Sequence, residues 1–235
     1  MASTSAPPRP ATARRTTIAL KILMAGTGLV FVGYVLLHMY GNLKALAGEE
    51  SFNTYAEHLR TIGEPMLPYG GLLWVIRVVL LLSLVGHAYA AFTLWARAGT
   101  ARRTRYAAGK AALRTAWMRW GGVFLLLFVV WHLLHFTILK VSPNTAAQGP
   151  DVENNPYRLV VASFQVPWMT LLYVLAMVAL ALHLAHGVFS AMQTLGWTST
   201  PAAYRRAKWL GNGSAVVIAG GFLLPPLAIL FGLIK

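Results

Sequence analysis

Five long apolar stretches dominate this sequence of 235 residues. Each is long enough to cross a bilayer as a helix, which takes about 20 residues. A water-soluble domain is excluded, because 57% of the residues are hydrophobic and only 11% are charged, and such a chain could not cover its own surface with polar groups. The sequence therefore predicts an all-α integral membrane protein with spans over about residues 20–42, 70–96, 120–140, 167–195 and 211–234.

The segments between the spans are too short for a separate soluble domain. Residues 1–17 are rich in Pro, Ser, Thr and Arg, so we expect a disordered basic tail there and a membrane domain over residues 18–235. The connections over residues 41–69 and 141–166 have room for one short or amphipathic helix each. The first span is too long for the core of a signal peptide and lacks a small-residue cleavage site, which predicts that it is retained.

Positive charge is concentrated on one side of the predicted membrane. Residues 1–21, 97–119 and 196–210 hold fourteen of the twenty Lys and Arg residues and no acidic residue. All six acidic residues lie in the connections on the other side. The positive-inside rule then predicts a cytoplasmic N-terminus and an external C-terminus, so the net charge of +14 indicates topology rather than nucleic-acid binding. A basic face also suits anionic lipid or an acidic partner.

Histidines are the ionisable residues that recur inside the apolar stretches. Six of the seven lie in or at the ends of spans, and each of the first four spans carries at least one. Intramembrane ionisable residues are costly and therefore mark functional candidates, although an isolated one can simply form an interhelical hydrogen bond. Carboxylates are absent from the predicted spans, which argues against a proton pump or an ion-driven transporter.

Histidines on four different helices match the requirement of bis-histidine haem, in which two imidazoles approach the iron from opposite faces. Zinc would favour three or four clustered ligands, and the lack of cysteine excludes thiolate sites and covalent c-type haem. At 1.5 Å per residue, His38 lies roughly 26 Å and His87 roughly 15 Å from the basic side. This difference in depth predicts two haems, but counting residues does not say which histidines form each pair.

Around these histidines the chain resembles a known family. It is similar to the dihaem cytochrome b membrane anchor of succinate dehydrogenase/fumarate reductase, in its single-chain five-helix form, and it looks most like the versions of high-GC actinobacteria. The segments that carry the resemblance are HMYGNLKAL, SFNTYAEHLRTIGEP, GHAYAAF, MRWGG, VVWHLLHF and LHLAHGVFSAMQTLGW, in this order along residues 18–197.

The resemblance implies a pairing of the haem ligands. His87 and His183 would hold the iron of the haem nearer the cytoplasm, and His38 and His132 the iron of the outer haem. His135 and His186, three residues further along their helices, become candidates for propionate or quinone contacts, with packing or a hydrogen bond as the alternative. Arg77 is a candidate for an outer-haem propionate, and its alternative is snorkelling to the interface.

The implied function is electron relay in respiratory complex II of the bacterial cytoplasmic membrane. A flavoprotein subunit with FAD and an iron–sulfur subunit would oxidise succinate in the tricarboxylic acid cycle and pass electrons through two haem b groups to menaquinone. This chain would hold no succinate site, and the complex could form a higher oligomer. Glu57, His58 and Glu64 of the first outer loop are candidates for quinone proton exchange, and their alternative is that they are solvated loop charges.

Two other functions stay open at this point. One is the dihaem cytochrome b of a formate dehydrogenase or hydrogenase, which differs in its soluble partner. The other is a haem-free anchor or a small multi-pass transporter, against which the four-helix set of histidines argues.

Overall fold

The structure is a computed structural model that describes residues 11–100, 110–138, 149, 152 and 154–235. These residues are helical apart from short connections, and strands are absent from this part of the chain. The elements are α1 (Ala11–Leu43), the 3-10 helix η1 (Lys44–Ala47), α2 (Glu49–Thr61), α3 (Gly71–Thr100), α4 (Lys110–Phe136), α6 (Pro156–Phe164), α7 (Pro167–Thr194) and α8 (Pro201–Leu230).

Five of these helices are long and apolar enough to span a membrane, which confirms the predicted fold class. Two helices begin about ten residues earlier than the predicted spans: α4 begins at Lys110 rather than near residue 120, and α8 begins at Pro201 rather than near residue 211. Thr200 caps α8 by accepting a hydrogen bond from the Ala203 amide at 3.1 Å, and Pro201 fits the first helical turn because it has no N–H to satisfy. The basic residues of the segment 196–210 therefore lie largely on the first turns of α8 rather than in a loop.

The N-terminal boundary also differs. Helix α1 begins at Ala11, within the segment expected to be a disordered tail over residues 1–17. Residues 1–10 lie outside the described residues.

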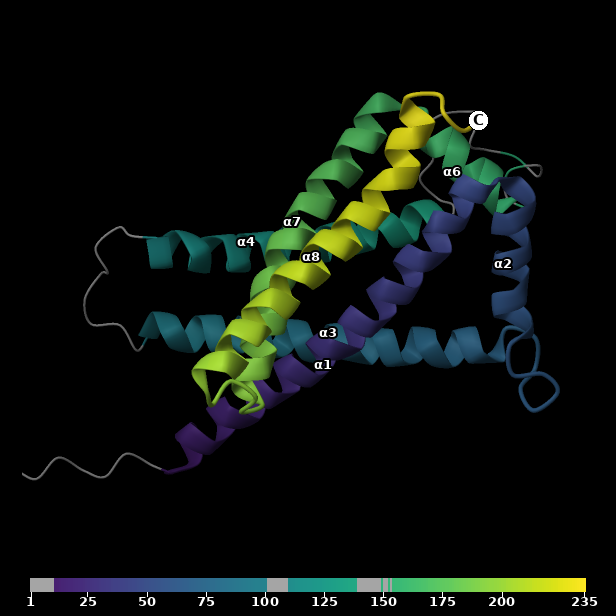
Figure 1. The fold of residues 1–235 in the computed structure, drawn as a ribbon. Coiled ribbons are helices and arrows are strands. Elements are labelled where there is room, and N and C mark those ends of the chain that lie inside the picture. Colours follow the sequence, from purple (N-terminus) through teal and green to yellow (C-terminus); the bar gives the residue numbers. More distant parts are fainter. Residues whose placement is uncertain (1–10, 101–109, 139–148, 150–151, 153) are drawn as a thin grey trace, which may run out of the picture.

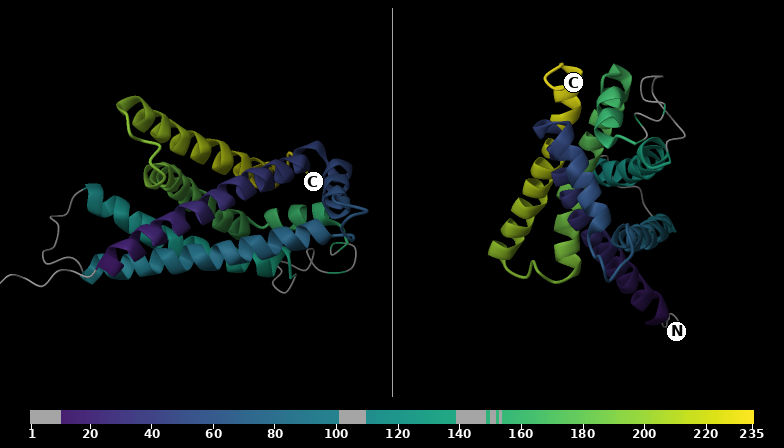
Figure 2. Two further views of the ribbon diagram at one scale, coloured as in Figure 1. Left: turned by 90° about the horizontal axis from the view of Figure 1, so that it is seen from below. Right: turned by 90° about the vertical axis from the view of Figure 1, so that its right-hand side faces the viewer.

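Helices α1 and α7 form the centre of the bundle. Helix α7 packs along α8 and contacts α1 and α4, while α1 also contacts α3 and α8. Helices α3 and α4 lie along nearly the same direction in Figure 1, separated from each other, and cross the direction of the other three spans. The start of α1, the end of α3, the start of α4 and the turn between α7 and α8 lie at one end of the bundle in both Figure 1 and the left view of Figure 2. We call this the basic end.

The opposite end carries the two short helices α2 and α6, which pack against each other, and we call it the capped end. Gly48, with a φ of 94°, lets the chain leave η1 and enter α2 in a conformation that other residues rarely adopt. The two loop helices lie in the connections that have room for one short helix each by length, and the first of these connections also holds η1.

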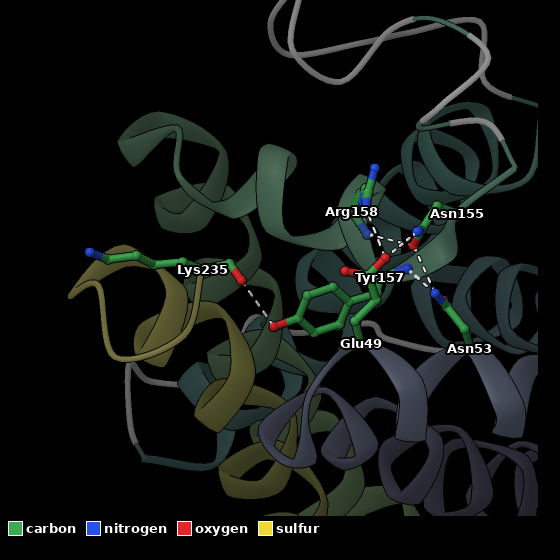
Figure 3. A network of polar contacts seen from close by, with 6 residues as sticks. All are labelled: Glu49, Asn53, Asn155, Tyr157, Arg158 and Lys235. Atoms are coloured by element: carbon green, nitrogen blue, oxygen red, sulfur yellow. Dashed lines mark hydrogen bonds and ion pairs between the residues drawn. The ribbon is translucent and has the colours of Figure 1, made fainter.

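A polar network joins α2 to α6 across the capped end (Figure 3). The Asn155 side chain accepts a hydrogen bond from the Asn53 amide at 2.9 Å and donates one to the Glu49 carboxylate. The Asn155 oxygen also accepts from the Arg158 backbone amide at 3.2 Å and so caps the start of α6. Arg158 forms an ion pair with Glu49 at 3.1 Å.

The outer surface of the spans is apolar, as contact with lipid requires. Leu37, Leu82 and Val216 are each about two-thirds exposed or more. Exposed tryptophans occur towards both ends of the bundle, with Trp74 on the side of the capped end and Trp209 on the side of the basic end. Tryptophan is enriched at both membrane–water interfaces, so these residues mark the two edges of the lipid-facing band.

Candidate functional site

The structure brings His38 of α1 and His132 of α4 together. Their ring centroids are 5.8 Å apart, with an angle of 76° between the ring planes. Aromatic rings surround this pair: Tyr34 stacks on His38 at 5.4 Å, Phe222 lies 5.6 Å from His38, and Phe128 lies 6.0 Å from His132. Both histidines lie in the last two turns of their helices, on the side of the capped end.

A second pair consists of His87 of α3 and His183 of α7. Their ring centroids are 6.2 Å apart, with an interplanar angle of 58°. A glycine faces each ring: a Cβ on Gly28 would lie 3.4 Å from His87 Cε1, and a Cβ on Gly122 would lie 3.6 Å from His183 Cε1. The backbones of α1 and α4 therefore approach the two imidazoles closely.

The two pairs lie at different depths in the bundle. On α1, Thr27 contacts His87 and His38 follows eleven residues later, a distance of about 16 Å along the helix. On α7, Tyr173 contacts His132 and His183 follows ten residues later, about 15 Å along the helix. Two separate centres are therefore arranged one above the other between the basic end and the capped end.

Hydrogen bonds determine which ring nitrogen of His87 is available to a ligand. The Thr27 hydroxyl donates its hydrogen to the Leu23 carbonyl at 2.7 Å. Toward His87 Nδ1, at 3.1 Å, the same oxygen therefore acts as an acceptor, and Nδ1 carries the proton. The lone pair is then left on Nε2 of His87.

Metal ligation by protein atoms alone does not fit these centres. Among the described residues, no group of three or more His, Cys, Asp or Glu side chains could hold a metal ion. Two imidazoles suffice only where the other ligands come from elsewhere, as in haem, whose macrocycle supplies the equatorial nitrogens. An imidazole pair also has the spacing for this, because two metal–nitrogen bonds of about 2 Å and two rings of about 1.15 Å radius give centroids roughly 6.3 Å apart.

The other intramembrane candidates take different positions. His135 is 1% exposed, and both of its ring nitrogens contact hydroxyl groups. His186 is half-buried one turn beyond His183 on α7. The Arg77 guanidinium lies over the Trp74 ring, 4.9 Å from its centroid, near the start of α3.

A surface cavity of about 600 Å³ opens at the capped end, beside the end of α1. Its size is in the range of small-molecule sites. Burial raises the pKa of the Tyr55 hydroxyl above its ordinary value, so this group stays protonated and able to donate a hydrogen bond. The cavity is lined by Tyr40, Lys44, Ala47, Glu50, Ser51, Thr54, Tyr55 and His58.

Of the three outer-loop candidates for proton exchange, only His58 lines this cavity. Glu57 accepts a hydrogen bond from the Tyr69 hydroxyl at 2.8 Å and pairs with Arg60 at 3.3 Å. The bond from Tyr69 to Glu57 raises the pKa of the Tyr69 hydroxyl. Glu64 is exposed and lies outside the cavity lining. Glu50, which belongs to the same acid–base cluster of the first outer loop, also lines the cavity.

Sequence reasoning also missed the hydroxyl groups that contact the histidines. Thr27 could have been found, because it precedes His38 by eleven residues. This is about three helical turns and places both residues on the same face of α1. Tyr173 and Ser163 carry no such signal, since their contacts join α7 and the loop helix α6 to α4.

The fold and the two histidine pairs define a five-span membrane protein that brings imidazole rings together in pairs at two depths. Residues 94–221 match the family model described as succinate dehydrogenase/fumarate reductase transmembrane subunit, and this match covers more than half of the chain. The chain therefore belongs to that family. No curated protein and no solved structure matches it. The matched region includes His132 and His183, whereas His38 and His87 precede it.

Proposed function

We propose that this chain is the membrane-anchor cytochrome b of a succinate:menaquinone oxidoreductase in a bacterial cytoplasmic membrane. It would carry electrons between an iron–sulfur subunit and menaquinone through two haem b groups. The observation that supports this most directly is the pair of histidine contacts, with centroid separations of 5.8 and 6.2 Å, close to the roughly 6.3 Å expected of axial imidazoles. The family match favours this function over a formate dehydrogenase or hydrogenase cytochrome, and over a transporter.

In this proposal His87 and His183 hold one iron, and His38 and His132 hold the other. The haem iron supplies one-electron transfer, and the protein supplies ligation, depth and a dry environment. Thr27 keeps the proton of His87 on Nδ1, which would leave the lone pair of Nε2 available to hold the iron. His186 and Arg77 stay candidates for contacts with propionates.

The orientation in the membrane follows from charge. We propose that the basic end faces the cytoplasm, where the flavoprotein and iron–sulfur subunits, with FAD and the clusters, would dock. Arg205, Arg206 and Lys208 are exposed on the first turns of α8 at this end. Exposed cations of this kind steer the association of acidic partners and contact anionic lipid.

We place menaquinone at the cavity of the capped end. Tyr40, which lines it, follows His38 by only two residues on α1, so the cavity lies at nearly the same depth as the haem that His38 and His132 would hold, although the two side chains leave α1 on different faces. Tyr55 can donate a hydrogen bond to a quinone oxygen, and His58 and Glu50 can exchange protons with water at the open side. This assignment replaces the acidic loop residues Glu57 and Glu64 as the nearest proton carriers.

The ligand assignment is tested by counting haems in histidine variants. The purified protein should show close to two non-covalent b haems per chain in its dithionite-reduced spectrum. His87→Ala and His183→Ala should each remove one spectral component, and His38→Ala and His132→Ala the other. A stoichiometry near one, or none, contradicts the proposal.

The quinone cavity is tested in the assembled complex. His58→Ala and Glu50→Gln should slow quinone reduction while both haems stay reducible by succinate. Glu57→Gln is the matched control, since this residue also lies on α2 but outside the cavity lining. Equal rates in His58→Ala and the native complex would remove the cavity from the proposal.

A further inference from the structure

An uninterrupted line of hydrogen bonds begins at His132 and ends on the backbone of α6. His132 Nδ1 lies 3.2 Å from the Tyr173 hydroxyl, and the same hydroxyl lies 3.3 Å from His135 Nδ1. His135 Nε2 lies 3.0 Å from the Ser163 hydroxyl, which donates to the Leu159 carbonyl at 2.6 Å. We call Tyr173, His135 and Ser163 the supporting chain of His132.

All three members of the supporting chain are buried. Tyr173 is 7%, His135 is 1% and Ser163 is 0% exposed. Charged imidazole is costly in such an environment, so each histidine is neutral and has one N–H group and one lone pair. Each hydroxyl has a single hydrogen to donate, and therefore every contact in the line has a direction that can be worked out.

The direction is set at the α6 end. A carbonyl can only accept, so Ser163 donates to Leu159 and must accept from His135 Nε2–H. His135 Nδ1 then holds a lone pair and accepts the Tyr173 hydrogen. The Tyr173 oxygen in turn accepts from His132 Nδ1–H, which leaves the lone pair of His132 on Nε2. Any reversal would place two lone pairs or two hydrogens against each other.

We propose that the supporting chain positions His132 as an iron ligand and lowers the reduction potential of the haem that it binds. An acceptor on Nδ1–H makes an imidazole a stronger donor to a metal, and this favours the more positive ferric iron. The inference rests on the proposed function, because it needs a haem at His38 and His132. It also assigns His135 a positioning role in place of a propionate or quinone contact, since neither of its ring nitrogens is left for one.

The four histidines proposed as ligands differ in the hydrogen-bond partners of their rings. His87 has the Thr27 oxygen beside Nδ1 and a hydrogen bond with the Met24 backbone. His183 Nδ1 is buried without a hydrogen-bond partner, and the His38 ring forms no hydrogen bond within the described residues. The line that extends across three helices thus supports one ligand only, and its removal should affect one haem only.

The test is redox titration of both haems in the intact complex. Tyr173→Phe removes one oxygen and should shift the midpoint potential of the haem at His38 and His132 to a more positive value, with the other haem unchanged. Ser163→Ala should produce a smaller shift in the same direction, because His135 then loses the acceptor that sets its tautomer. His135→Gln keeps a hydrogen-bond acceptor and a donor at this position. The midpoint potential of the haem at His38 and His132 should therefore lie nearer the native value in this variant than in His135→Leu.

Two comparisons separate this role from a general effect on packing. Phe136→Leu changes a ring that contacts both His132 and Tyr173 but removes no hydrogen bond, and it should leave the potential near the native value. Native potentials in Tyr173→Phe and His135→Leu, with both haems present, would overturn the inference alone. A native complex without a haem at His38 and His132 would instead overturn the proposed function, and this inference with it.

Discussion

Replacing Thr27 by valine should weaken haem retention at His87 and His183 while sparing the other centre. The substitution removes the oxygen that lies 3.1 Å from His87 Nδ1 and leaves the Met24 backbone as the remaining hydrogen-bond partner of the ring. The net contribution of one hydrogen bond is about 0.5–1.5 kcal/mol. Thr27 and His87 are half-buried, so this range applies, and it corresponds to roughly a 2- to 12-fold loss of affinity.

The assay is transfer of haem from the purified complex to excess apomyoglobin, followed spectrally for each component. Thr27→Ser keeps the hydroxyl and should behave like the native protein, which separates the hydrogen bond from the loss of side-chain volume. Equal retention in Thr27→Val and Thr27→Ser, or faster loss of the haem at His38 and His132, would refute the reasoning.

Two further predictions concern the scaffold. Gly211→Ala should lower stability by about 1–3 kcal/mol in thermal unfolding in detergent, because the new Cβ would lie 2.5 Å from the Ala185 carbonyl oxygen of α7. Gly213→Ala is the control: its Cβ would meet nothing within 4 Å, so the change should be neutral or stabilising by up to about 1 kcal/mol. Asn155→Ala removes the N-cap of α6 and its contacts with α2. The free energy of local unfolding at the capped end should fall by about 1–2 kcal/mol, so proteolysis there should be faster by the corresponding factor. An unchanged cleavage rate would contradict this role of the cap.

Much of the fold could be predicted from the sequence, because a bilayer imposes length and hydropathy on every span. The five spans were predicted on this basis, whereas the two connections that hold the short helices α2 and α6 were identified only as having room for one short helix each. The start of the fifth span was misplaced by about ten residues, since hydropathy detects where lipid begins and not where a helix begins. Thr200 and Pro201 are the local signals that set the true start.

The histidine pairs show where sequence reasoning stops. Depth alone separated His38 from His87 but could not match either to a partner, because spans that follow one another in the sequence need not be neighbours. The resemblance implied the pairs that the structure brings within contact distance. Contacts between α4, α6 and α7 have no periodic signature in any one helix, so the role of Tyr173 emerged only from the fold.

Helix α1 takes part in both centres, since Thr27 supports one and His38 belongs to the other. Their separation of eleven residues is close to three whole helical turns, so both side chains lie on the same face of α1. One inserted residue between them would rotate His38 by about 100° away from His132 while leaving Thr27 in place. Natural variation in this stretch should therefore occur by substitution and not by insertion or deletion, whereas the connections outside the spans are free to change in length.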